Sequence, residues 1–125
     1  MHYNLKTPCH ECPYVGKVPG WIGAHDTAQD FVDLVRVDAP FPCHESIDYA
    51  AVEHGESRKP EQQLKSAHVA HCAGYAIFMS KMSKLSRRPE LAAMQDRLKA
   101  KCKVQVVWPP DKLVELHDTA SGKAP

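Results

Sequence analysis

The stretch "PEQQLKSAHVAHCAGYAIFMSKMSKL", residues 60–85, carries the longest periodic pattern in the chain. Residues spaced alternately by four and three positions fall along one stripe of a helix. They are Leu64, His68, His71, Tyr75, Phe78, Met82 and Leu85. Pro60 is a favourable first-turn residue. The pattern predicts a main helix over about residues 60–85 as the spine of the fold, with Cys72 at the edge of its inward stripe.

Two breaker-rich segments precede this stretch. Residues 7–25 are dense in proline and glycine, which predicts an irregular loop. A second loop is predicted at about 38–46, where "APFPCHES" places two prolines just before Cys43. Between the loops, apolar residues at helical spacing predict a helix over about 27–37, capped by Asp26 or Thr27.

The remaining segments carry shorter signals. "IDYAAVEHG", residues 47–55, indicates a brief helix, and Pro89 opens a further helix. "VQVVW" at 104–108 indicates a short strand, and "DKLVEL" at 111–116 a last helical turn or two. The tail at about 119–125 is expected to be frayed.

Length and charge limit the classes of protein to which this chain can belong. A chain of 125 residues suits one domain, and we expect a single domain over 1–125 that is mainly α, with long irregular loops and little β. Sixteen Lys and Arg against fifteen Asp and Glu leave a formal charge of +1, which is not the signature of a nucleic-acid or membrane polycation. The sequence shows neither an eighteen-residue apolar run nor a secretory signal, so we expect a soluble cytoplasmic protein with no membrane partner.

Cysteines carry the strongest chemical signal. In a reducing cytosol, thiols at motif spacing are more often metal ligands or redox groups than disulfides. Cys9 and Cys12 form a Cys-x-x-Cys pair on the first loop, Cys43 lies on the second loop, and Cys72 lies in the predicted main helix. Because a small chain with long loops buries little apolar surface, metal ligation can supply folding free energy. We expect these four cysteines to ligate one metal centre, with Cys102 as a spare.

The identity of the metal follows from how the four cysteines are spaced. One pair plus two isolated cysteines suits a 4Fe-4S cluster, whose four irons offer separate attachment points. Cys12 is also followed by Pro13, a common cluster context. Zinc sites are often built from two close pairs, so zinc is the alternative cofactor, and a metal-free redox dithiol is the third interpretation.

Histidines adjoin three of the four cysteines. His10, His44 and His71 can donate hydrogen bonds to sulfur or replace a cysteine as ligand. His68 is grouped with them because it shares the inward stripe of the predicted helix. On that stripe, His68 and His71 also have the ordinary interpretation of core histidines bonded to backbone or carboxylate.

Four blocks in a fixed order carry a resemblance. "CHECPY", "PGWIG", "FPCH" and "HCAGYAIF" resemble a family of small uncharacterised proteins found chiefly in bacteriophages and some bacteria, over roughly residues 7–78. The resemblance implies that the four cysteines named above are the family's own, that His44 is its following histidine and that Gly74 is its glycine after the last cysteine. Val15 stands where relatives often carry a basic residue. The resemblance implies a phage-encoded protein of the host cytoplasm, but no reaction.

Two functional hypotheses remain open. The first is a small iron-sulfur module that binds a macromolecule, either nucleic acid or a host protein, through the basic run at 81–90. The second is a cluster-dependent redox enzyme with an open iron beside the side chains of His10, Glu11, His44 and Glu45. "CHECP" lacks the histidine of a c-type haem motif, and no Gly-rich phosphate loop is present. No catalytic residue is assigned.

Overall fold

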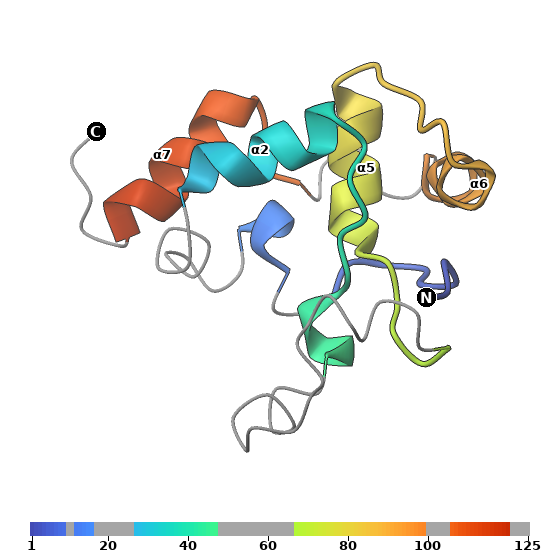
Figure 1. Ribbon diagram of the computed structural model, residues 1–125. Coiled ribbons are helices and arrows are strands. Elements are labelled where there is room, and N and C mark those ends of the chain that lie inside the picture. Colours follow the sequence, from blue (N-terminus) through green and yellow to red (C-terminus); the bar gives the residue numbers. More distant parts are fainter. Residues whose placement is uncertain (10–11, 17–26, 48–66, 100–105, 121–125) are drawn as a thin grey trace.

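The computed structural model describes residues 1–9, 12–16, 27–47, 67–99 and 106–120 (Figure 1). These ranges contain four α-helices, α2 (Ala28–Arg36), α5 (Ala73–Lys81), α6 (Pro89–Leu98) and α7 (Pro110–Ala120), and two 3-10 helices, η1 (Pro13–Val15) and η2 (His44–Ser46). Their β content is two isolated bridges, with no strand in the described ranges. The prediction of a small, mainly helical domain with little β is confirmed.

Helix α5 forms the centre of the fold. Every residue from Ala73 to Met79 is buried, as expected for a helix that is apolar on all sides. Helix α6 packs on one side of α5 and α2 on another, while α7 packs on α2 (Figure 1). Among the described helices, none is long and apolar enough to cross a membrane.

Two of the predicted helices are present at the predicted places. Helix α2 matches the helix predicted at 27–37, and the Thr27 hydroxyl accepts a hydrogen bond from the Asp30 N–H at 3.2 Å. One face of α2 buries Val32 and Val35 against the core. Helix α6 begins at Pro89, as its sequence indicates.

The predicted main helix at 60–85 is confirmed at residues 73–81, but it is shorter at both ends within its described part. Helix α5 begins only at Ala73, because Cys72 has an extended backbone and caps the helix. Residues 67–72 form a turn and extended bridges, and residues 60–66 lie outside the described part of the chain. The helix ends at Lys81, and Leu85 is 71% exposed instead of facing inward.

Three smaller predictions are also not matched by the described residues or lie partly outside them. Residues 106–108 do not form a strand, and 104–105 lie outside the described ranges. Helix α7 is longer than a turn or two because Pro110 starts it and Leu113 and His117 bury one face. The tail is therefore helical at residues 119 and 120, whereas the brief helix predicted at 47–55 falls almost wholly outside the described residues.

A buried carboxylate ties the end of α2 to the loop between α5 and α6. The Asp38 carboxylate accepts hydrogen bonds from the Ser86 hydroxyl at 2.8 and 2.9 Å and from the Arg87 N–H at 2.8 Å. The Arg88 guanidinium lies 3.4 Å away, and the Asp38 side chain is only 10% exposed. Burial alone would raise the pKa of Asp38, but these donors outweigh it and hold the pKa below its ordinary value.

We expect Asp38→Asn to lower the free energy of unfolding by about 1–3 kcal/mol, because the charge that strengthens these hydrogen bonds is removed and the new amide NH₂ faces donors. Asparagine tolerates the left-handed backbone at this position, where φ is 58°. The control is Asp33→Asn on α2, whose ion pair with Arg36 is about half exposed and contributes less than about 1 kcal/mol.

The difference between wild type and Asp38→Asn depends on pH with a defined sign. Because the folded pKa of Asp38 is lowered, its stabilisation is full above the unfolded pKa of about 4 and is lost as the pH falls through the folded value. Urea unfolding at pH 7 and in acid measures this. A difference that persists unchanged in acid contradicts the role of the Asp38 charge.

Candidate metal centre

Two of the predicted cysteine ligands lie on neighbouring extended segments. The Cys43 N–H donates to the Ala70 carbonyl at 2.7 Å, and the Cys72 N–H donates to the Phe41 carbonyl at 2.9 Å. These bonds take the place of helical hydrogen bonds, which explains why the chain is extended up to Cys72. Residues 29 positions apart in sequence are thereby fixed side by side.

The first loop is anchored by η1, directly after Cys12. The Tyr14 side chain is fully buried and its hydroxyl donates at 3.1 Å to a backbone carbonyl of α2. From α7, the His117 Nε2–H donates to the Pro13 carbonyl at 3.0 Å. Contacts from two helices therefore hold the turn that carries Cys12.

Each of the three buried cysteines directly precedes a helical segment. Cys12 precedes η1, Cys43 precedes η2 and Cys72 precedes α5. Backbone N–H groups at the start of these segments interact with the sulfurs: Tyr14 with Cys12, Glu45 with Cys43, and Tyr75 with Cys72 at 3.4 Å. Such N–H groups carry partial positive charge, favour the thiolate and orient a ligand sulfur.

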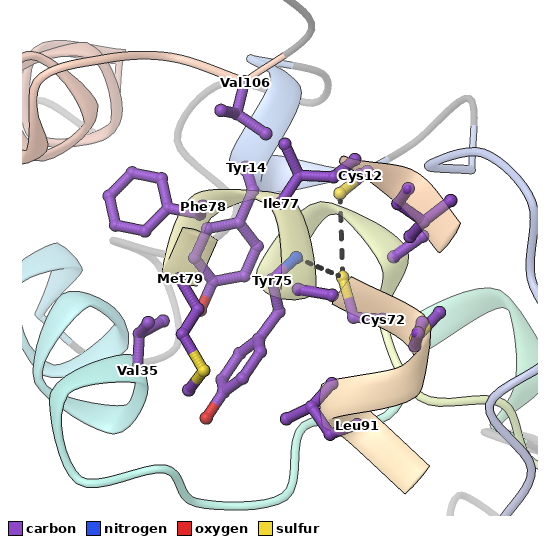
Figure 2. Close-up of a cluster of buried hydrophobic side chains, with 14 of the residues drawn as sticks. Cys12, Tyr14, Val35, Cys72, Tyr75, Ile77, Phe78, Met79, Leu91 and Val106 are labelled. Carbon is purple, nitrogen blue, oxygen red and sulfur yellow. Dashed lines mark hydrogen bonds between the residues drawn. The ribbon is translucent and has the colours of Figure 1, made fainter. Parts of the chain in front are cut away.

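The two most deeply buried sulfurs face each other. The Sγ atoms of Cys12 and Cys72 are 3.7 Å apart, and Figure 2 shows the Tyr75 N–H directed at the Cys72 sulfur beside them. A tetrahedral ion with metal–sulfur bonds of about 2.3 Å places its sulfurs about 3.8 Å apart. This separation therefore suits two ligands of one metal ion.

A second group of donors lies toward the solvent. The sulfurs of Cys9 and Cys43 and a carboxylate oxygen of Glu45 all lie within 4.8 Å of one another. Cys43 is buried, Cys9 is partly buried and Glu45 is exposed. Cys9 also interacts with Cys12, which links the two groups. All four predicted cysteines are thus brought together, and Glu45 joins them.

Burial and mutual proximity disfavour thiolates here in the absence of a cation. The pKa of Cys12 is raised well above its ordinary value, chiefly by its hydrogen bond with Cys72, while Cys9 lowers it. Burial, followed by the charge of Cys9, raises the pKa of Cys43 to about 11. A bound metal ion reverses this preference because it takes thiolates as ligands.

Gly74 makes room for the buried sulfurs. A Cβ atom at this position would lie 2.3 Å from the Cys12 sulfur, 3.1 Å from the Tyr14 Cβ and 3.8 Å from the Cys72 sulfur. Side-chain atoms do not approach this closely, so residue 74 must lack a Cβ while Cys12 keeps its position. In the sequence, only the resemblance singled out this glycine.

The four histidines predicted to lie around the sulfurs differ in their positions. His10 and the side chain of His44 lie outside the described residues. His68 lies in the exposed turn at 67–68, several residues before α5. His71 is fully buried next to Cys72.

His71 supports the backbone of the site. Its Nδ1–H donates to the Cys72 carbonyl at 3.1 Å, and its Nε2 accepts from the Phe41 N–H and the Arg88 guanidinium, each at 3.4 Å. Burial lowers the pKa of His71 to about 4, so the ring is neutral at pH 7. The ring orients Cys72 through its main chain.

No family model, no curated protein and no solved structure matches this chain. The resemblance to the bacteriophage family stays a prediction.

Proposed function

We propose that this protein is a small iron-sulfur protein in which Cys9, Cys12, Cys43 and Cys72 ligate a 4Fe-4S cluster. The observation that carries the proposal is the convergence of these four sulfurs from three segments distant in sequence. The N–H groups around the three buried sulfurs support it further, because such contacts accompany cluster ligands and tune their potential. The absence of a Cβ at Gly74 also leaves room for the Cys12 sulfur in the proposed site.

The four sulfurs form two groups rather than one tight set. The buried pair of Cys12 and Cys72 is distinct from the outer group of Cys9, Cys43 and Glu45, since these five donors do not all lie within 4.8 Å of one another. A single tetrahedral ion requires every sulfur pair to be about 3.8 Å apart. A cluster attaches each cysteine to a separate iron, so its ligand sulfurs lie farther apart than those around a single ion. To hold a cluster, the Cys12 and Cys72 sulfurs would therefore have to separate from their 3.7 Å contact.

Zinc is the second candidate, and one distance favours it. The 3.7 Å separation of the Cys12 and Cys72 sulfurs is close to the edge of a tetrahedral zinc-thiolate site. Closure of Cys9 and Cys43 onto the same ion would complete a four-cysteine structural site. The same ligands serve both proposals.

The position of the centre supports a structural role. Cys12 and Cys72 belong to the hydrophobic core itself, so the metal would join η1 to the start of α5. We propose that the resulting module acts through a macromolecular partner, nucleic acid or a host protein, in a host cytoplasm. Of the predicted basic surface at 81–90, Arg88 is engaged with Asp38 and is 24% exposed, which leaves Lys81, Lys84 and Arg87 as its candidate cations.

A cluster-dependent redox enzyme is the alternative role. It is favoured by the outer group, where the partly buried Cys9 and the exposed Glu45 bring the ligands toward solvent. An electron-transfer or catalytic cluster needs such access.

Purification without oxygen from iron-replete cells tests the cofactor. We expect a brown protein with about four irons and about four acid-labile sulfides per chain, because sulfur-to-iron charge transfer absorbs visible light. Cys102→Ala is the control and should have the same metal content. A colourless anaerobic sample with one zinc per chain and no sulfide contradicts the cluster and supports zinc, whose filled d shell gives no such absorption.

A further inference from the structure

The outer donor group has the composition of a metal site in its own right. It combines two cysteine sulfurs with one carboxylate oxygen, and its ligand atoms lie within 4.8 Å of one another. Thiolate and carboxylate are both ordinary ligands of zinc, and thiolate also binds iron. Glu45 is exposed, so an incoming ion reaches this group without opening the core.

A turn fixed at several points holds Glu45 in place. The Ser46 N–H and hydroxyl both donate to the Cys43 carbonyl, at 2.9 and 2.7 Å. The Ser46 hydroxyl in turn accepts from the Ala70 N–H at 3.0 Å. The backbone of η2 is thereby tied to the extended segment before Cys72, and the residue next to Ser46 keeps its place beside the Cys43 sulfur.

Ionisation of these groups is favoured by a counter-charge. Two thiolates and a carboxylate within 4.8 Å repel one another when ionised. A divalent cation at the centre of the outer group would remove the repulsion.

We propose that Glu45 is a metal ligand, and that with Cys9 and Cys43 it forms an entry site for a divalent cation, Fe²⁺ or Zn²⁺, on the solvent side of the centre. This inference rests on the proposed function, since it assumes that the cysteines bind metal. The buried sulfurs of Cys12 and Cys72 complete the centre after the ion has entered.

Zinc titration of the full-length, reduced, metal-free protein tests the inference. Zn²⁺ is added without oxygen in competition with a coloured chelator, to wild type, Glu45→Gln and Glu115→Gln. Glu115 is an exposed carboxylate on α7 and serves as the matched control. Loss of a ligand should weaken zinc affinity at least about tenfold in Glu45→Gln, whereas Glu115→Gln should stay within about twofold of wild type.

A cobalt titration separates ligation from a simple effect of charge. Co²⁺ takes similar ligands and its visible spectrum depends on them. We expect Glu45→Gln to change the spectrum of the cobalt-loaded protein. Affinity equal to wild type, or weaker affinity with an unchanged cobalt spectrum, overturns the assignment of Glu45 as a ligand.

The outcomes also distinguish this inference from the proposed function. If wild type binds zinc and Glu45→Gln binds it equally well, only the role of Glu45 fails. If wild type itself binds neither zinc nor cobalt, the cysteine centre fails and the inference with it. If zinc binding depends on Glu45 but the anaerobic protein contains no sulfide, the entry site stands and the cluster does not.

Discussion

Cys72→Ala is expected to abolish metal binding and to leave a chain that is unfolded or aggregated at room temperature, a loss of more than about 4 kcal/mol. The Cys72 side chain has three roles at one point of the fold. It lies 3.7 Å from the Cys12 sulfur, it caps the central helix α5 by accepting the Tyr75 N–H, and it is 4% exposed within the core. Metal content and thermal unfolding measure the effect.

Cys72→Ser separates ligation from capping. Serine is a preferred N-cap residue, so its hydroxyl can accept the Tyr75 N–H, but it does not supply a thiolate. If metal ligation dominates, Cys72→Ser should lose the metal and nearly as much stability as Cys72→Ala. Cys102→Ala should behave as wild type. A Cys72→Ala protein with normal metal content and melting would rule out ligation by this residue.

Gly74→Ala is the second substitution for which we expect a large loss, about 2–3 kcal/mol together with most of the bound metal. In an ordinary helix this change is stabilising by about 1 kcal/mol, so the expected sign is opposite to helix propensity. The reason is the 2.3 Å approach of the added Cβ to the Cys12 sulfur and its 3.1 Å approach to Tyr14. Denaturant unfolding and metal analysis measure it.

A double-mutant cycle tests the physical cause of that loss. With Cys12→Ala in place, the clashing sulfur is gone, so Gly74→Ala should cost at least about 1 kcal/mol less than in the wild-type chain. Both halves of the cycle are measured on metal-free protein in a stabilising osmolyte, which favours the folded state enough for unfolding to be followed and keeps loss of ligation out of the comparison. Equal costs in the two backgrounds, or a Gly74→Ala protein as stable as wild type, contradict the close contact.

The elements predicted well are those whose signals are local. Thr27 caps α2 by accepting an N–H of its first turn. Pro89 opens α6 because its fixed φ suits the first turn, where an N–H would have no helical partner. The start of each helix can therefore be predicted from the residue type at that position. Their apolar spacing then identifies the buried face, as Val32 and Val35 show.

The main helix was mispredicted because its boundary depends on distant residues. His68 and His71 continue the helical spacing of Tyr75 and Phe78, yet the backbone before Cys72 bonds to Phe41 and to the N-terminal segment. Periodicity cannot report such partners. The extended segment is also what brings Cys43 beside Cys72.

The sequence predicts which cysteines come together, but not what surrounds them. Cys-x-x-Cys spacing and the two isolated cysteines were sufficient to name Cys9, Cys12, Cys43 and Cys72 as one set. The close approach of Gly74 to the Cys12 sulfur and the position of Glu45 beside Cys9 and Cys43 arise only in the folded chain. A cysteine placed just before a helical turn, as in Cys-Pro-Tyr, is the sequence feature that would have indicated the N–H contacts to sulfur.

X-ray absorption at the metal edge of the anaerobically purified protein tests cysteine ligation most directly, because it counts the neighbours of the metal whatever its identity. The proposal predicts a metal surrounded by sulfur at about 2.3 Å, with further iron neighbours if the cluster is present. Cys12→Ser and Cys43→Ser should each lower the number of sulfur neighbours or lose the metal. A metal surrounded only by oxygen and nitrogen, or a wild-type protein that holds no metal when purified without oxygen, would contradict ligation by these four cysteines.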